Sequence, residues 1–217
     1  MKITRSKIKK IINHEQKLIN GELFFESAVI VPLIKANKEF HLLFQVRSDN
    51  IRQGGEIGFP GGQVEPKDRN LTETAVRETC EELGIKPSDV NTFGYLGSYL
   101  NPMGALVHAI IGELKVPPEK FSVNKSEVKE IFTVPLSFFE NTEPEYYHMK
   151  ISVSPYIKKE TGEVSFPVEK LGLHVKYSKR REGITYPVIV YKINDKIIWG
   201  ITAYIVKYFV DRLKKIN

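Results

Sequence analysis

The spacing of apolar residues along the chain predicts strands mixed with helices. Between about residues 23 and 46, two short β-rich runs, SAVIVPLI and FHLLFQV, flank the polar turn KANKE. Further strands are expected at TFGYLGSYL and ALVHAIIGEL, joined by the turn NPMG, and EIFTVPLSFF indicates a strand that runs into a short helix. Residues 145–198 have the pattern of additional strands and loops. The predicted fold class is therefore α/β or α+β.

Three segments have helical periodicity. Residues 1–22 place their isoleucines and leucines near one stripe among lysines, and the chain closes with a second amphipathic segment at about 200–215. The third helix is expected from about Leu71 to Leu83. Asn70 can cap its start with Glu73 in the capping-box position, and Gly84 suits a left-handed C-terminal cap.

The chain shows neither an internal repeat nor a Gly/Ser linker, so we predict one domain over residues 1–217. Its parts are an N-terminal helix at 1–22, a core at 23–140, and strands with a closing helix at 141–217. With 41% hydrophobic residues in a chain of 217, the composition supports a buried core and excludes a wholly disordered or fibrous chain.

Composition also restricts the environment and the partners. The charged N-terminus lacks the apolar core of a signal peptide, and the single cysteine, Cys80, cannot form an internal disulfide. No apolar run reaches the ~18–20 residues of a spanning helix. We therefore expect a cytoplasmic protein that does not enter a membrane. The net charge of +6 suits an anionic partner, but dispersed surface lysines explain it equally well, and we do not predict binding to nucleic acid.

Acidic residues gather on one side of the predicted helix at 71–83. Glu78, Glu81 and Glu82 share one sector, while Val76, Cys80 and Leu83 lie opposite, so we expect the apolar face on the core and the acids on the other face. Like charges three and four residues apart cost a few tenths of a kcal/mol per pair. Anions in the last turns of a helix cost roughly 0.3–1 kcal/mol more.

Two interpretations of the acidic trio remain open. A solvated acidic face is the simpler one, but the two penalties favour a site that binds a hard divalent cation through oxygen ligands, such as Mg²⁺ or Mn²⁺. The five histidines are scattered, which argues against zinc. The turn Phe59-Pro60-Gly61-Gly62 precedes the helix and supports a site, because glycines let the backbone approach a ligand closely.

Residues Gly62 to Ile85 resemble the Nudix box, the loop-helix-loop signature of Nudix hydrolases. Five residues separate Gly62 from Asp68, and Arg77-Glu78 and Glu81-Glu82-Leu83-Gly84-Ile85 match the helical part. Eight residues rather than the usual seven precede Arg77, and Thr79 replaces the usual aliphatic residue.

With these departures, the motif resembles the form that it has in the coenzyme A pyrophosphatase subgroup. That subgroup has the Phe-Pro-Gly-Gly turn and an upstream signature that matches Leu42-Leu43, Arg47-Ser48 and Gly55-Glu56-Ile57. One residue is missing between Arg52 and Gly55 relative to the usual spacing. The resemblance covers roughly residues 25 to 215.

The resemblance implies an α/β/α sandwich with a mixed sheet and extra terminal helices. It makes Glu78 and Glu82 the leading metal ligands, with Glu81 and a backbone carbonyl near Gly61 as further ligands. Arg77 is expected to orient the box by pairing with Asp68. The general base is Glu81 or an acid outside the box, Glu127 or Glu130, although Glu127 can equally be a surface charge.

The implied reaction is hydrolysis of the diphosphate of coenzyme A to 3′,5′-ADP and 4′-phosphopantetheine with Mg²⁺ or Mn²⁺. Arg47 and Arg52 are expected to bind the 3′-phosphate or the diphosphate, with Gly62 in the substrate loop, although ordinary solvated arginines remain the alternative. A pyrophosphatase for ADP-ribose, dinucleotides or other nucleoside diphosphate derivatives is the second interpretation. A non-catalytic Nudix ligand sensor is the third. A homodimer is compatible with the sequence.

Overall fold

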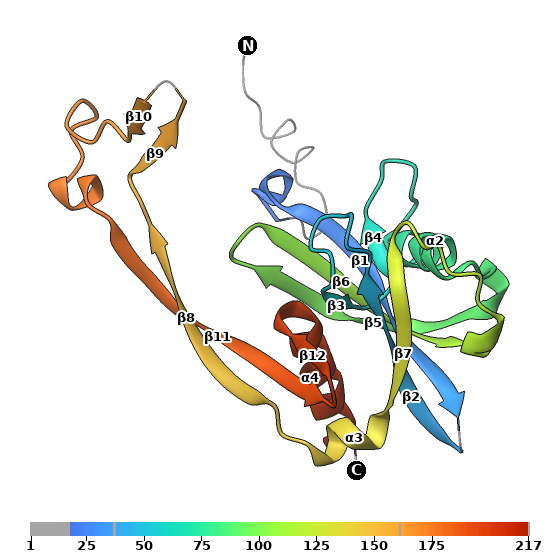
Figure 1. Ribbon diagram of the computed structural model, residues 1–217. Helices are drawn as coiled ribbons and strands as arrows, with labels where there is room; N and C mark the ends of the chain where they lie inside the picture. The colour runs from blue at the N-terminus through green and yellow to red at the C-terminus, as the bar shows by residue number, and fades with distance from the viewer. Residues whose placement is uncertain (1–17, 37, 161, 217) are drawn as a thin grey trace, which may run out of the picture. The chain divides into compact units, whose positions relative to one another are not determined.

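A computed structural model describes residues 18–36, 38–160 and 162–216 of the protein (Figure 1). The chain divides into two compact units, one that ends at Leu136 and one that begins at Ser137. The helix expected at 1–22 falls almost entirely outside the described residues. The single domain over 1–217 remains a prediction.

The first unit is built on a mixed seven-stranded sheet. The strand order is β3-β2-β1-β6-β5, with β4 paired to β1 and β7 paired to β2. The pair β1·β6 is parallel and the remaining pairs are antiparallel. The strands are β1 (Phe25–Ala36), β2 (Glu39–Arg47), β3 (Ile57–Gly58), β4 (Gly61–Gln63), β5 (Val90–Asn101), β6 (Ala105–Leu114) and β7 (Val128–Pro135).

Helix α2 (Leu71–Leu83) packs against β1 and β4 of this sheet. Between the helix and the sheet lies a core of small and branched apolar side chains. Short 3-10 turns connect the elements at Gly21–Leu23, Pro87–Asp89 and Pro118–Lys120. The core residues are Ala28, Ile30, Ile34, Leu43, Ala75, Leu83, Val90, Ile110 and Leu114.

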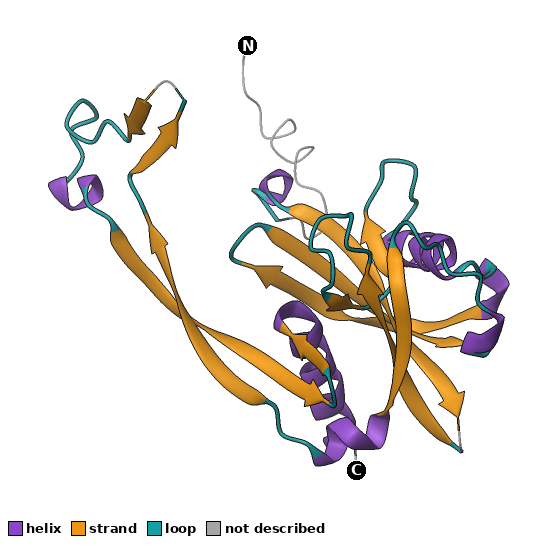
Figure 2. Cartoon of the chain, in the orientation of Figure 1, coloured by secondary structure: helices purple, strands orange, loops and turns teal. Residues whose placement is uncertain are grey.

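The second unit contains a three-stranded antiparallel sheet of order β12-β11-β8 and a separate hairpin of β9 and β10 (Figure 2). Phe139 is buried and meets the ring of Tyr191 edge to face at 5.1 Å. The elements are α3 (Leu136–Asn141), β8 (Glu145–Val153), β9 (Tyr156–Lys159), β10 (Gly162–Ser165), a 3-10 turn (Val175–Ser178), β11 (Arg181–Ile193), β12 (Lys196–Trp199) and α4 (Gly200–Lys214).

The fold class predicted from the sequence is confirmed as mixed α+β with a mixed sheet. The helix expected at about 71–83 has those bounds, and the closing helix ends one residue earlier than expected. The strand that runs into a short helix is also present, as β7 and α3. The second helical layer of an α/β/α sandwich remains a prediction.

Candidate active site

Both ends of α2 are fixed by the residues that the sequence singles out. The Asn70 side chain accepts a hydrogen bond from the Glu73 backbone N–H at 3.0 Å. At the other end Gly84 has φ 64°, the left-handed conformation that favours glycine, and its N–H donates to the Cys80 carbonyl at 2.9 Å. These caps set the position of the three acidic residues in the last turns of the helix.

Glu82 does not lie on an outer acidic face, so that part of the sequence prediction is wrong. Its side chain is buried, and the buried positions of the helix are Thr74, Ala75, Thr79, Glu82 and Leu83. The helix is rotated so that Glu82 turns toward the sheet, while Val76 and Cys80 are only partly buried. The rotation is possible because the sheet supplies polar partners for the carboxylate at this point.

Two hydrogen bonds hold the Glu82 carboxylate, one on each oxygen. The Gln45 side-chain amide on β2 donates to Oε1 at 2.8 Å, and the Gly61 backbone N–H on β4 donates to Oε2 at 2.8 Å. Burial nevertheless raises the pKa of Glu82 to about 7, against the lowering effect of these bonds and of the Arg47 charge. A carboxylate in this environment favours a nearby cation.

Glu78 lies against the glycine loop. A Cβ atom on Gly62 would come within 2.3 Å of Glu78 Oε2, so the carboxylate occupies space that only glycine leaves open. Burial raises the pKa of Glu78 as well. Glu81 differs from its neighbours because its side chain is 56% exposed. The three acids therefore stand in three different environments.

Arg77 connects the loop to the acids. Its guanidinium donates to both oxygens of Asp68, as the sequence predicts, at 3.0 Å each. The Nη1 group also donates to Glu78 Oε1 at 2.7 Å and to Glu81 Oε2 at 3.3 Å. Arg77 is thus placed to orient the box, and in this arrangement it also occupies oxygens of two of the three predicted metal ligands.

The upstream arginines and Glu127 lie on the β2 and β7 side of the same unit. Arg47 is half-buried at the end of β2, and its Nε donates to the carbonyl of Arg52, whose side chain is exposed. Glu127 immediately precedes β7, and its charge contributes to the raised pKa values of Glu78 and Glu82. Arg47 and Glu127 therefore both lie within electrostatic reach of the acidic helix.

The chemistry of these side chains fits a hard divalent cation. Within the described parts of the chain, no group of three or more His, Cys, Asp and Glu side chains is already arranged to hold a metal ion. The carboxylate oxygens are engaged by Arg77, Gln45 and Gly61 instead. Burial disfavours the charged forms of Glu78 and Glu82, and Glu78 lies against Gly62. Carboxylate oxygens are nevertheless the ligands that Mg²⁺ and Mn²⁺ prefer.

Gln45 contacts Glu82 but was not among the site residues predicted from the sequence. The available signal was a polar residue inside the apolar run FHLLFQV, at a position that the structure buries almost completely. A buried amide in a strand requires a partner, and here the partner is Glu82.

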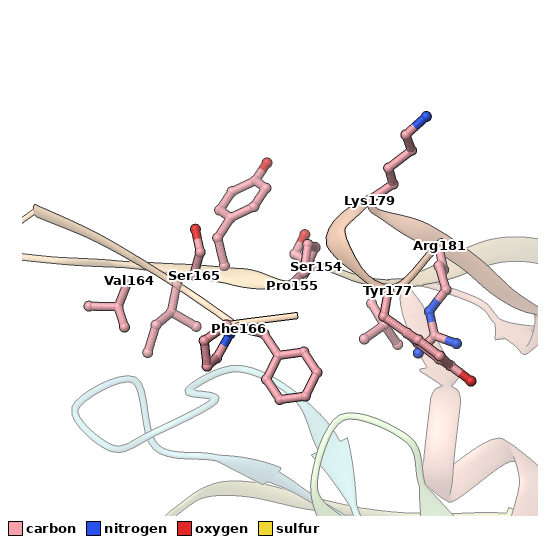
Figure 3. A pocket seen from close by; sticks show the side chains of 12 residues that line it. Ser154, Pro155, Val164, Ser165, Phe166, Tyr177, Lys179 and Arg181 are labelled. Atoms are coloured by element: carbon pink, nitrogen blue, oxygen red, sulfur yellow. The ribbon is translucent and has the colours of Figure 1, made fainter. Parts of the chain in front are cut away.

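The second unit has a hollow of about 440 Å³ between the β9–β10 hairpin and the chain before β11 (Figure 3). Its wall is mainly apolar, with Tyr156, Phe166 and Tyr177 among the lining residues. Of the basic run at 179–181, Lys179 and Arg181 line the hollow, and the Arg181 guanidinium lies 4.9 Å from the centre of the Tyr177 ring. None of the predicted site residues lines this hollow.

The described helices include none with the length and apolar character that crossing a membrane requires.

Comparison with known proteins identifies the class. Residues 24–150 match the model of the NUDIX domain. The mouse peroxisomal coenzyme A diphosphatase NUDT7 is 40% identical over 126 residues, which cover 57% of this chain and 51% of the mouse protein. The Nudix hydrolase NudL of Yersinia pestis (strain Pestoides F) is 31% identical over 189 residues, 86% of this chain and 79% of NudL.

A solved MutT/nudix family structure from Enterococcus faecalis covers 97% of this chain and 68% of its own, with 15% identity and a TM-score of 0.48. With the family match over more than half of its length and the NudL similarity over most of it, the chain belongs to the Nudix hydrolase family. It is an enzyme of that family. The chain spans about half the length of the mouse relative.

Proposed function

We propose that the protein hydrolyses the diphosphate bond of coenzyme A or its derivatives and releases 3′,5′-ADP and 4′-phosphopantetheine. The observation that carries the proposal is the convergence of Glu78, Glu82 and Arg47 beside the glycine loop, in a chain with the upstream signature of the coenzyme A subgroup. The similarity to a relative named as a coenzyme A diphosphatase supports the same substrate.

The acidic residues of α2 would hold Mg²⁺ or Mn²⁺, with Glu78 and Glu82 as the main ligands and Glu81 and the Gly61 carbonyl as further ones. The bound cation would neutralise charge on the diphosphate and lower the pKa of the attacking water. The Gly61 N–H and Gln45 hold Glu82 in one orientation, and Arg77 holds the loop. In the reaction, water oxygen bonds to phosphorus as the bridging P–O bond breaks.

Two acids compete for the role of general base. Glu81 is exposed, and Arg77 contacts its Oε2, so its second oxygen can approach a water molecule. Glu127 is supported by its charge, which acts on both Glu78 and Glu82 and helps to raise their pKa values. A Glu127→Gln variant with low turnover but unchanged Mn²⁺ binding would assign the base to Glu127.

Arg47 and Arg52 would bind the phosphates. The glycine loop that contains Gly62 would let its backbone approach the phosphates closely. The Arg47 guanidinium keeps further N–H groups besides the Nε that contacts Arg52, and the Arg52 side chain is exposed. The planar guanidinium forms paired hydrogen bonds to phosphate, which suits these positions.

The decisive experiment is a substrate panel with purified protein. Coenzyme A, dephospho-coenzyme A, ADP-ribose and NADH are compared with Mg²⁺ and with Mn²⁺, and products are identified by chromatography. The proposal expects the highest kcat/KM for coenzyme A and release of 3′,5′-ADP. A protein that ignores the 3′-phosphate would instead be a pyrophosphatase for ADP-ribose or related compounds, and a protein without turnover would be a sensor.

The remaining proposals concern the setting of the enzyme. A cytoplasmic location is supported by the lone free cysteine, Cys80, since reducing compartments hold thiols rather than disulfides. Fluorescence imaging of the full chain tests it, with peroxisomes as the alternative suggested by the mouse relative. Binding assays test the expected small-molecule substrate and the expected absence of a nucleic-acid partner. Light scattering tests the homodimer.

A further inference from the structure

Gln45 is a buried amide in the middle of an otherwise apolar stretch of β2. Its side chain is 1% exposed, and the preceding residues Leu42, Leu43 and Phe44 are all fully buried. Its partners across the sheet are Gly58 on β3 and Ile131 on β7. A buried amide costs free energy unless both its N–H and its carbonyl groups find partners.

The orientation of this amide is determined by Glu82. The Gln45 Nε2 group donates to Glu82 Oε1 at 2.8 Å, and turning the amide over would place its oxygen against a carboxylate oxygen. The amide oxygen, Oε1, therefore cannot exchange places with the nitrogen. In the part of the chain that the structure describes, this buried oxygen has no hydrogen-bond partner.

Glu82 is held in one plane by this arrangement. One of its oxygens accepts from Gln45 and the other from the Gly61 backbone N–H, so both are fixed while each keeps a free lone pair. Outer groups that hold a carboxylate in this way are the usual means by which proteins orient a metal ligand.

We propose that Gln45 is a positioning residue for Glu82 at the divalent-cation site. Its amide N–H fixes the carboxylate, and its carbonyl oxygen accepts a hydrogen bond from a water molecule bound to the cation. The proposal rests on the proposed function, because it requires that α2 holds the cation. It adds a residue from outside the box, on a different element of the sheet.

An ordinary buried water would also satisfy the Gln45 oxygen, so the test must depend on the metal. Gln45→Met keeps the length of the side chain and removes both polar groups. Binding of Mn²⁺ is measured without substrate, by the electron paramagnetic resonance signal of free Mn²⁺. The Mn²⁺ dissociation constant is expected to rise about ten- to a hundredfold. The melting temperature in EDTA should fall, because the buried Glu82 carboxylate loses the Gln45 N–H, so the second readout is a smaller gain in melting temperature on addition of Mn²⁺.

Thr79→Val is the matched control. Thr79 is fully buried on α2, and its Oγ1, like the Gln45 oxygen, has no hydrogen-bond partner among the described residues. Replacing this hydroxyl by a methyl group of similar shape should raise the melting temperature and leave the Mn²⁺ dissociation constant unchanged. The control separates the removal of a buried polar atom from an effect on the metal.

Equal dissociation constants for Mn²⁺ in the wild type and Gln45→Met would overturn the role of Gln45 alone. So would a variant that melts lower in EDTA but gains as much from Mn²⁺ as the wild type does. A wild type that does not bind Mn²⁺ would overturn this proposal together with the metal site. Because substrate is absent, an incorrect substrate assignment leaves the result unaffected.

Discussion

Arg77 grips Asp68 through two parallel hydrogen bonds, Nε to Oδ1 and Nη2 to Oδ2, each 3.0 Å long. The Asp68 carboxylate also accepts from the Glu65 backbone N–H and the Thr74 hydroxyl, each at 2.9 Å, and its side chain is only 2% exposed. The loop before α2 is therefore fastened to the helix at the residue that also contacts Glu78.

This arrangement predicts a specific loss of stability in acid. The Arg77 guanidinium, with the Glu65 N–H, holds the pKa of Asp68 well below its usual range. The folded protein therefore binds fewer protons than the unfolded chain in acid. The stabilisation is complete above the ordinary aspartate pKa of about 3.9 and is lost as the pH falls below it.

Urea denaturation of wild type and Asp68→Asn between pH 3 and 7 measures the free energy of unfolding as a function of pH. The variant should be less stable at pH 7 and should show a shallower decline in acid, and identical profiles would contradict the prediction.

The acidic helix predicts loss of turnover without loss of the fold. Glu78→Gln and Glu82→Gln each remove an anionic ligand from the proposed cation, so kcat should fall by orders of magnitude. Removal of metal with EDTA should abolish activity, and Mg²⁺ or Mn²⁺ should restore it. Circular dichroism checks the fold. Glu73→Gln is the control, because Glu73 lies on the same helix but pairs with Arg69 at its start. Near-normal turnover in both test variants would exclude these residues as metal ligands.

The helix and its caps were predictable from sequence because their signals are local. Asn70, Glu73 and Gly84 act on backbone groups a few residues away, and the structure has the helix between the predicted ends. The rotation of the helix was not predictable in this way. Whether Glu82 faces solvent or the sheet depends on Gln45, a residue 37 positions away in the sequence.

The same contrast holds for the other site residues. The pair of Arg77 and Asp68 follows from the box resemblance, whereas the bonds of Arg77 to Glu78 and Glu81 depend on side-chain conformations that spacing does not specify. The second unit was predicted only as further strands and loops. Its strands β8 and β11 pair across a long intervening segment, which local patterns do not reveal.

Gly84 predicts a stability effect beyond backbone conformation. A Cβ atom at this position would lie 2.0 Å from the carbonyl oxygen of Ser122, in addition to the left-handed φ of 64°. A residue other than glycine costs about 1–2 kcal/mol in this conformation, so Gly84→Ala should lower the free energy of unfolding by more than that amount. Gly172→Ala is the control, because φ is 63° there and nothing lies within 4 Å of its Cβ. Urea denaturation should show the larger loss for Gly84→Ala, and equal losses would mean that Ser122 yields without cost.

Substrate choice is tested at the arginines of the upstream signature. The charge of Arg47 acts on Glu82, and the Arg47 Nε donates to the backbone carbonyl of Arg52. If Arg47 or Arg52 binds the 3′-phosphate, its replacement by alanine should impair hydrolysis of coenzyme A more than that of dephospho-coenzyme A. A charged hydrogen bond contributes roughly 1.5–3 kcal/mol, which corresponds to about a ten- to hundredfold change in the ratio of the two kcat/KM values.

Replacement by lysine should restore only part of the ratio, because lysine lacks the planar fork that binds phosphate through two parallel bonds. Equal losses on both substrates would instead assign the arginines to the diphosphate or to the support of the loop. Both substrates contain the diphosphate and differ only in the 3′-phosphate.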